Sequence, residues 1–291
     1  MKAFVYGSMN IDMVHTLPYL PATGETLACL NYEVHIGGKG LNQAVALKKA
    51  GAETVMLGSV GTDGDFLVDF LTSNDVNTLH INRCDTPTGH AIIEVDRQGQ
   101  NQMVLFRGAN HANGKSYCEK ALAEMSKGDL LLTQYETDSV EYITEKAHNK
   151  GVITAFNPSP FVDELKNFPY NNIDILILNE QEGKQITGKN EPENICRCLL
   201  QKNPSLKIAL TLGGDGSVYA DSEQYFVVPA KQVKAVDTTG AGDTFTGFFL
   251  TSLLGGDLPA DAMKTATEAA AIAVTRYGAA ETIPTLNDIK N

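Results

Sequence analysis

The sequence predicts an α/β fold with a central, mostly parallel sheet that is covered by helices on both faces. Two observations carry this prediction. Strand-length and helix-length runs alternate along most of the chain, and the strand-length runs are apolar at nearly every position. A strand that is apolar on both sides lies between two layers of helices, as in parallel sheets. We therefore expect a three-layer α/β/α arrangement.

The elements can be assigned in order from the N-terminus. We predict strands at 3–7, 54–60, 129–133, 152–156, 174–178 and 207–212, and helices at 41–50, 65–73 and 139–149. Gly51 directly follows the first of these helices and Gly151 comes two residues after the end of the third, close to where glycine commonly ends a helix. The 291 residues are close to the upper size for one hydrophobic core, so we expect a single domain over 1–291.

Two stretches, 13–36 and 86–107, interrupt the alternation. They contain extended segments at 33–36, 90–95 and 102–106, with no helix between them. We predict that they form a small antiparallel β sheet inserted into the α/β body. Because a few strands cannot bury both faces alone, this sheet is expected to act as a lid or as a dimer surface. The alternative is a plain meander at the edge of the main sheet.

Composition argues against several classes of function. Lys and Arg number 23 against 35 Asp and Glu, and the net charge of -12 has the wrong sign for gripping nucleic acid. The longest apolar run, 269–274, is far shorter than the roughly 20 residues that span a bilayer. Asn10 and Asp12 interrupt the apolar stretch that a signal peptide needs, so we expect a cytoplasmic protein without a nucleic-acid or membrane partner. The five scattered cysteines are expected to be free, buried thiols.

The most informative segment is 235–247, with the sequence AVDTTGAGDTFTG. Gly240, Ala241 and Gly242 are small enough for the backbone to bend and approach a ligand, and Asp243 stands where an apolar helix begins. Free N–H groups at such a helix start bind anions, which suits a phosphoryl group that gathers charge in a transition state. The alternative is that Asp243 only caps the helix.

A second glycine-rich segment, Gly37-Gly38-Lys39-Gly40-Leu41-Asn42, leads into the helix predicted at 41–50. It is not a Walker A loop, because no Ser or Thr follows the lysine. Taken alone, it is consistent with ligand contact or with a simple tight connection.

Polar or glycine-rich residues also follow four of the predicted strands. They are Asn10 and Asp12, Glu136, Asn179 and Glu182, and the segment Thr211-Leu212-Gly213-Gly214-Asp215-Gly216. Ligands bind at the carboxyl edge of a parallel sheet, so this convergence predicts a site there, although polar loop residues are common. The sequence has no HExxH, no Gly-x-Ser-x-Gly and no Gly-x-Gly-x-x-Gly after the first strand, which argues against a zinc hydrolase, a serine hydrolase and a dinucleotide oxidoreductase.

The segments SMNID, GGKGLN, LNEQE, TLGGDG and DTTGAGDTFTG together resemble the PfkB carbohydrate kinase family, and within it the ribokinases. The resemblance covers essentially the whole chain and implies a ribokinase-like fold. It also implies phosphoryl transfer from ATP to a sugar hydroxyl, with ribose phosphorylated at its 5-hydroxyl as the first expectation. Deoxyribose, fructose or a nucleoside remain alternative acceptors, because Leu41 and Tyr135 depart from the residues common in the family.

The resemblance also implies a role for individual residues. Asp243 is the expected base, and Gly240, Ala241 and Gly242 are expected to form the anion hole. The sugar would be held by Asn10, Asp12, Gly38, Lys39, Asn42 and Glu136. The nucleotide would be bound by Asn179, Thr211, Gly213, Gly216 and Gly242. Glu182, together with Asn179, would organise Mg²⁺ largely through water.

The family resemblance further implies a monovalent cation, usually K⁺, beside the anion hole. The matching positions are Asp237, Thr239, Arg276, Gly278 and Thr282, acting largely through backbone carbonyls; for Gly278 the alternative is a helix C-cap. A homodimer formed through the lid is also expected. A catalytically silent sugar-binding or regulatory protein is the alternative of a different class, and the intact Asp243 and glycine turn argue against it.

Overall fold

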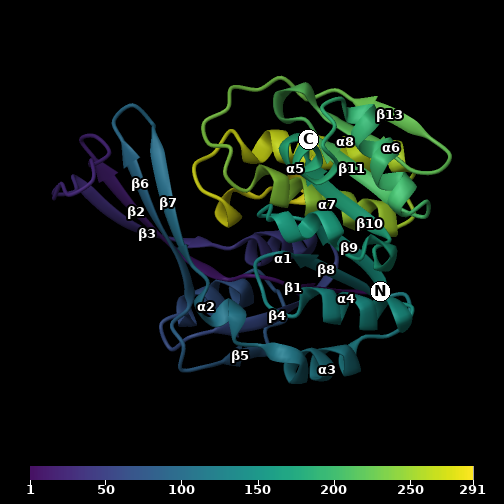
Figure 1. Cartoon of the computed structure of the whole chain (residues 1–291), viewed down its shortest axis with the longest axis horizontal. Coiled ribbons are helices and arrows are strands. Elements are labelled where there is room, and N and C mark those ends of the chain that lie inside the picture. The colour runs from purple at the N-terminus through teal and green to yellow at the C-terminus, as the bar shows by residue number, and fades with distance from the viewer. Residues whose placement is uncertain (291) are drawn as a thin grey trace.

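The computed structural model, which describes residues 1–290, has a large sheet in its body and a small sheet that projects from it (Figure 1). The strand order of the large sheet is β13-β12-β11-β10-β9-β8-β1-β4-β5. Its strands are β1 (Lys2–Tyr6), β4 (Glu53–Val60), β5 (Ile81–Arg83), β8 (Leu130–Gln134), β9 (Ile153–Asn157), β10 (Ile175–Asn179), β11 (Lys207–Thr211), β12 (Ser217–Ala220) and β13 (Tyr225–Val228). All neighbouring pairs of this sheet are parallel except those of β12 with β11 and β13. The predicted parallel core is confirmed.

Helices cover both faces of this sheet. One layer contains α1 (Lys39–Lys49), α2 (Asp65–Ser73), α7 (Ala241–Leu254) and α8 (Pro259–Ala273), and the other contains α3 (Gly114–Glu124), α4 (Val140–Asn149), α5 (Glu180–Thr187) and α6 (Pro192–Lys202). The remaining helical segments are α9 (Leu286–Lys290) and the 3₁₀ turns η1 (Gly108–His111), η2 (Asp163–Asn167), η3 (Tyr170–Asn172), η4 (Gly213–Asp215) and η5 (Ala280–Thr282).

The alternation of side chains along β1 shows why three layers form. Ala3 and Val5 pack into the core beneath α1 and α7, whereas Phe4 and Tyr6 pack into the core on the opposite face. Successive side chains of a strand point to opposite faces, so an apolar strand needs a helical layer on each side. The expected α/β/α arrangement is confirmed.

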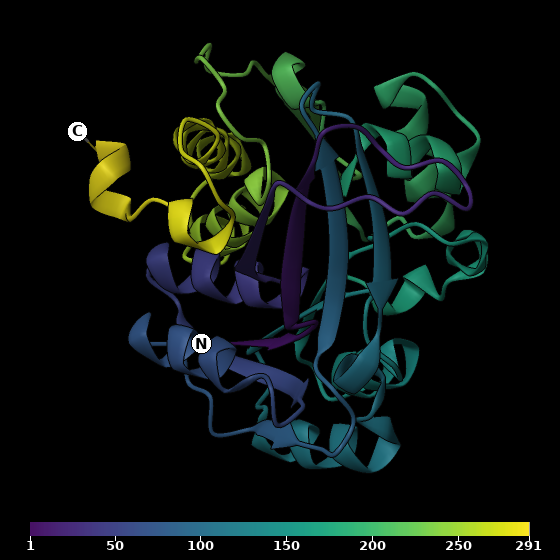
Figure 2. The same cartoon turned by 90° about the vertical axis from the view of Figure 1, so that its left-hand side faces the viewer.

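The small sheet is the predicted lid. Its strands are β2 (Asn10–Leu17), β3 (Asn31–Gly37), β6 (Gly89–Asp96) and β7 (Asn101–Phe106), in the order β3-β2-β6-β7. The hairpins β2–β3 and β6–β7 are antiparallel as predicted, but β2 and β6, which join them, run parallel. The predicted small antiparallel sheet is confirmed in its two hairpins, and the junction between them is parallel. The sequence did not predict this junction because the two hairpins are distant in the chain, and their relative direction is set by where they enter the body. Figure 2 shows the lid strands side by side, facing the viewer.

Two other expectations can be compared with the structure. Cys118 and Cys196 are buried free thiols as expected, but Cys29 is exposed, because it lies in the loop between β2 and β3. Within residues 1–290, none of the helices is both long and apolar enough to cross a membrane.

Candidate active site

Asp243 lies in the first turn of α7 and is buried, with 6% of its surface exposed. The N-cap of this helix is Gly240, whose φ of 73° is in the left-handed region that favours glycine. Within residues 1–290, both hydrogen bonds that the Asp243 carboxylate accepts come from side chains of α1, so the alternative that it only caps the helix is wrong. The carboxylate is available for another purpose.

Two amides of α1 hold this carboxylate. Asn42 Nδ2 donates to Asp243 Oδ2 at 2.9 Å, and Gln43 Nε2 donates to Asp243 Oδ1 at 2.8 Å. Asn42 Oδ1 is buried and has no hydrogen-bond partner within the part of the chain that the structure describes. A buried acceptor without a donor is costly, so this oxygen fits a ligand hydroxyl.

The glycines that precede α1 allow it to start against the end of β1. Gly38 has a φ of 99°, and a Cβ there would lie 2.7 Å from the carbonyl oxygen of Ser8. A Cβ on Gly40 would lie 2.5 Å from the carbonyl carbon of Gly7. Only glycine fits at both positions, and the close approach brings Lys39 to the carboxyl edge of the sheet.

The predicted sugar ligands Asn10 and Asp12 lie in β2 rather than in a loop after the first strand. Asn10 Oδ1 accepts a hydrogen bond from Asn110 Nδ2 at 2.7 Å. The Asp12 carboxylate occupies the space above Gly37, where a Cβ would lie 2.2 Å from Asp12 Oδ2. Both side chains are thus carried by the lid, close to the point where it leaves the body.

Glu136 joins this group from the loop after β8. The Ser8 hydroxyl and the Lys39 backbone N–H both donate to Glu136 Oε2, the second at 3.3 Å. Burial raises the pKa of Glu136, and Lys39 opposes that shift. Burial and the nearby charge of Glu136 raise the pKa of Asp12 to about 6, against the opposing effect of His35.

Lys39 supplies the positive charge of the site. Its ammonium interacts with three carboxylates, those of Glu136, Glu182 and Asp243. Burial alone would lower the pKa of Lys39, but the three carboxylates outweigh it and the pKa is raised. The lysine is therefore firmly protonated and can bind an anion.

Asn179 and Glu182 form a capping box at the start of α5. Asn179 Oδ1 accepts from the Glu182 backbone N–H at 2.8 Å, and Glu182 Oε2 accepts from the Asn179 backbone N–H at 2.9 Å. Burial raises the pKa of Glu182. The capping box fixes the Glu182 carboxylate beside a polar cavity of about 220 Å³ that Lys39 and Asp243 also line.

A larger cavity of about 360 Å³ lies next to this polar one. Its lining includes the predicted nucleotide ligands Thr211, Gly213 and Gly216, and small apolar residues of α8 such as Ala270 and Ala271. The two cavities share Thr211, Thr238 and Gly242. A Cβ on Gly242 would meet nothing within 4 Å, so a ligand can approach the backbone closely there.

The predicted cation ligands come together from two loops. Asp237 Oδ1 accepts from Thr239 N at 2.9 Å, and Asp237 Oδ2 accepts from Gly278 N at 3.1 Å. Burial opposes ionisation, but these hydrogen bonds outweigh it and lower the pKa of Asp237. Arg276 Nη1 donates to the Thr282 carbonyl at 3.3 Å. Gly278 lies beyond the C-cap of α8, Val274, so it is not the cap of that helix.

The donor atoms of these residues determine which metal ions they can hold. Across residues 1–290, no group of three or more His, Cys, Asp or Glu side chains could hold a metal. Glu182 and Asn179 nevertheless offer oxygen atoms beside a polar cavity, which fits a Mg²⁺ ion that keeps most of its water. The cation loops offer hard oxygen donors, which fit K⁺.

Comparison with known proteins decides the family. The profile of the pfkB family of carbohydrate kinases matches residues 1–286. The chain belongs to this family. It is 34% identical over 293 residues to a ribokinase of Haemophilus influenzae, covering 97% of this chain and 94% of that protein. It is 32% identical over 297 residues to a deoxyribokinase of Salmonella typhi, covering 98% of this chain and 96% of that protein.

A solved structure extends the similarity to the fold. The ribokinase of Arabidopsis thaliana, described as complexed with ribose and ATP, matches with a TM-score of 0.87 and 27% identity, covering 99% of this chain and 97% of that one. The ribokinase-like fold expected from the sequence is thus shown for this chain.

Several residues of the site were not found from the sequence. Ser8, Gln43, Asn110 and Asn157 are all buried and all make hydrogen bonds within the site. The only signal for Gln43 was a polar residue inside an otherwise apolar stretch of helix. Ser8 and Asn157 stand at strand ends, where the same reasoning that selected Glu136 could have selected them.

Proposed function

We propose that this pfkB family member is an ATP-dependent sugar kinase that phosphorylates ribose at its 5-hydroxyl. The observation that carries the proposal is the position of Asp243, a buried carboxylate that lines a charged polar cavity and directly follows Gly242, which this cavity shares with the larger one. The named ribokinase relatives support ribose as the acceptor. The deoxyribokinase relative makes deoxyribose the second candidate.

In the proposed reaction, Asp243 accepts the proton of the sugar hydroxyl as that oxygen attacks the terminal phosphorus of ATP, and ADP leaves. The transition state of such a transfer is loose, so a carboxylate suffices as base and most of the rate comes from positioning and electrostatics. Asn10, Asp12, Asn42 and Glu136 would accept or donate hydrogen bonds to the sugar.

Charge that develops on the phosphoryl oxygens would be met by Lys39 and by the backbone N–H groups at the start of α7. The Ala241 N–H donates to the Thr238 carbonyl at 3.3 Å. It therefore joins the anion hole with Gly240 and Gly242 only by exchanging this long hydrogen bond for one to phosphate. One such donor is worth about 3 kcal/mol in comparable enzymes.

Two cations complete the proposal. Glu182 and Asn179 would hold Mg²⁺ through water, and Asp237, Thr239, Arg276, Gly278 and Thr282 would frame a K⁺ site through backbone carbonyls. Mg²⁺ supplies charge neutralisation on the nucleotide phosphates, and K⁺ supplies positive charge near the start of α7. We expect ADP release to require Mg²⁺ and to rise when KCl replaces choline chloride.

We also propose that the whole chain is one kinase domain, with 13–36 and 86–107 as the lid, and that it dimerises through the lid. Val34, Met13, Ile92 and Val104 are neighbours across the four strands and therefore share one face of the lid. Val104 is 66% exposed, and every residue of the edge strand β7 is exposed. A second copy would cover this apolar row.

Sedimentation velocity tests the dimer. Val104→Lys should convert the dimer into a monomer, whereas Leu258→Lys, at an exposed leucine just before α8, should leave it unchanged. A wild-type protein that sediments as a monomer at micromolar concentration would contradict the proposal.

An acceptor panel in an ADP-release assay tests the reaction itself. We expect the highest kcat/KM with ribose, compared with deoxyribose, fructose and nucleosides. A higher kcat/KM for deoxyribose would reassign the acceptor within the same family. No ADP release with any sugar, combined with measurable sugar binding by calorimetry, would indicate the regulatory protein instead.

A further inference from the structure

Gln43 is an amide in the middle of an apolar helix surface. Its neighbours Leu41, Ala44 and Val45 are buried and apolar, and the Gln43 side chain is itself completely buried, with 0% of its surface exposed. A buried amide has one acceptor oxygen and two N–H donors, and each costs free energy if it lacks a partner. The hydrogen-bond partners of Gln43 therefore indicate the role of its side chain.

All three polar requirements of Gln43 are met by side chains from other elements. Its Oε1 accepts from Gln134 Nε2, at the end of β8, at 2.6 Å. Its Nε2 donates to Asp243 Oδ1 at 2.8 Å and to Asn157 Oδ1, at the end of β9, at 3.0 Å. Asn157 Nδ2 in turn donates to the Ile177 carbonyl of β10 at 2.9 Å.

The direction of these hydrogen bonds is fixed by their two ends. A backbone carbonyl and an ionised carboxylate can only accept, so Asn157 must direct its nitrogen at Ile177 and Gln43 must direct its nitrogen at Asp243. Turning the Gln43 amide over would place its oxygen against two other oxygens and its nitrogen against Gln134 Nε2. The amide orientation is therefore dictated by chemistry and not by an arbitrary assignment of O and N.

Helix α1, which carries Gln43, also packs closely against helix α7, which carries Asp243. A Cβ on Gly247 of α7 would lie 2.4 Å from Ala46 Cβ of α1, so the two backbones are in close contact one turn beyond Gln43 and Asp243. The start of α1 carries Lys39 and Asn42. One rigid helix thus presents the residues expected to hold the sugar and also sets the position of the base.

We propose that Gln43 is a positioning residue, which fixes the plane of the Asp243 carboxylate so that its remaining acceptor positions face the sugar hydroxyl. Gln134 and Asn157 hold the Gln43 amide in the donating orientation. If Asn42 were the sole donor, the Asp243 carboxylate could still rotate about the hydrogen bond at Oδ2. The second hydrogen bond, from Gln43 to Oδ1, fixes the plane of the carboxylate. This inference rests on the proposed function, because it concerns the base of that reaction.

Steady-state kinetics of a graded variant series tests it. Gln43→Met keeps the length of the side chain and removes both donors, so kcat should fall about 10- to 100-fold, as expected for one lost hydrogen bond to a charged group. The KM values for ribose and ATP should change less than threefold. Gln43→Glu, which replaces the donor by an acceptor facing Asp243, should cost more in kcat.

Gln134→Met provides an independent variant that removes no contact to Asp243. It frees only the Gln43 oxygen, so we expect a smaller loss of kcat, about 3- to 10-fold, again with little change in either KM. Asn203→Leu is the matched control, because it also removes a buried amide with three hydrogen bonds but lies at the opposite end of the strands. It should lower the thermal unfolding midpoint and leave kcat unchanged.

The outcomes separate the inference from the function. An active wild type with Gln43→Met within twofold of its kcat would overturn the positioning role and leave the proposed function standing. A kcat loss in Asn203→Leu equal to that in Gln43→Met at a similar unfolding midpoint would also overturn it, since general loss of stability would then explain both. A wild type inactive on every sugar would overturn the proposed function and this inference together.

Discussion

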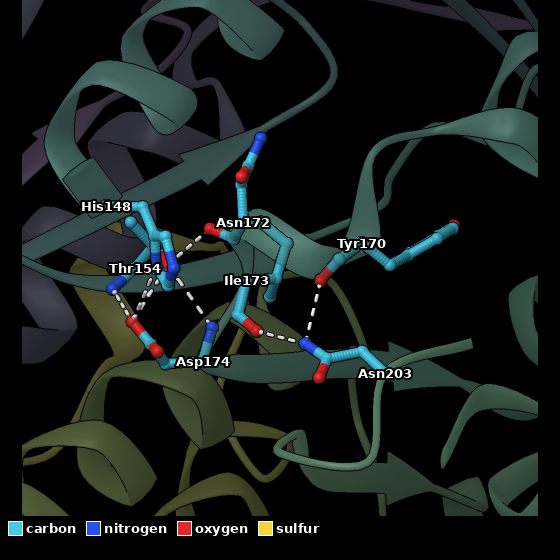
Figure 3. A network of polar contacts seen from close by, with 7 residues as sticks. All are labelled: His148, Thr154, Tyr170, Asn172, Ile173, Asp174 and Asn203. Atoms are coloured by element: carbon cyan, nitrogen blue, oxygen red, sulfur yellow. Dashed lines mark hydrogen bonds and ion pairs between the residues drawn. The ribbon is translucent and has the colours of Figure 1, made fainter. Parts of the chain in front are cut away.

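Two polar networks lie at opposite ends of the same parallel strands. At the amino ends, Thr154 N and Oγ1 donate to Asp174 Oδ2 at 2.8 and 3.0 Å, and Asn203 Nδ2 donates to the carbonyls of Tyr170 and Ile173, both at 3.0 Å (Figure 3). At the carboxyl ends, Gln43 links Asp243 to the strands through other side chains. Thr154, Asn203 and Gln43 are all buried, yet the two networks differ in what they connect.

The amino-end network mainly satisfies backbone groups. Thr154 Oγ1 also donates to the Asn172 carbonyl at 2.7 Å, and His148 Nδ1 lies 3.7 Å from Asp174 Oδ2. The carboxyl-end network instead surrounds Lys39 with three carboxylates, and burial raises the pKa of two of them, Glu136 and Glu182. Gathering like charges in a buried place costs folding free energy, which is typical of sites that perform chemistry.

The largest expected effect is at the base. Asp243→Asn should lower kcat by about 10²- to 10⁴-fold, the usual contribution of a positioned general base, while the KM for ATP changes little. ADP release measured under saturating ribose and ATP provides the check. If Asp243→Asn kept activity near that of the wild type, Asp243 would not be the base. The carboxyl-end network would then contain no catalytic group, like the amino-end network.

The next effect concerns the sugar. Asp12→Asn should raise the KM for ribose about 10- to 100-fold with a smaller change in kcat, because a charged acceptor is lost from a half-buried site. Initial rates over a range of ribose concentrations separate the two constants. An unchanged KM would place Asp12 outside the sugar site.

The pH dependence of sugar binding sharpens this assignment. The pKa of Asp12 is raised to about 6 by burial and by Glu136, with Glu281 adding to the shift and His35 opposing it. The ionised form is the better acceptor, so the KM for ribose should rise as the pH falls through about 6 and should be constant above about 7. In Asp12→Asn this limb of the pH profile should vanish. Its persistence would show that a group other than Asp12 is responsible.

The smallest effect on activity is expected at the amino ends. Thr154→Val removes a hydroxyl that bonds Asn172 and Asp174, so the free energy of unfolding should fall by about 1–3 kcal/mol while kcat and both KM values stay unchanged. Urea denaturation and the ADP-release assay measure the two properties separately. A fall in kcat without a fall in stability would show that the two ends of the sheet are functionally coupled.

Local patterns predicted much of the fold and part of the site. Every predicted strand of the large sheet and every predicted helix has a counterpart within a few residues. The reason is that a strand with apolar side chains on both faces is stable only between two layers of helices. The main element that the sequence did not predict is β2, the first strand of the lid. The apolar pattern ends the first strand before Asn10 and Asp12, whereas the chain enters a second strand, β2, at Asn10. Sequence spacing alone could not show that a strand begins so soon.

Local sequence established the three layers and identified Asp243 with its glycine turn at Gly240, because each depends on neighbouring residues or on a local motif. The tertiary structure set the need for glycine at Gly38 and Gly40, which pack against Ser8 and Gly7, and it selected the amides that hold Asp243. Asn42 and Gln43 are 201 and 200 residues away from it in the chain. It also decided the raised pKa of Asp12, since burial and the approach of Glu136 exist only after β2, α1 and the loop after β8 have come together.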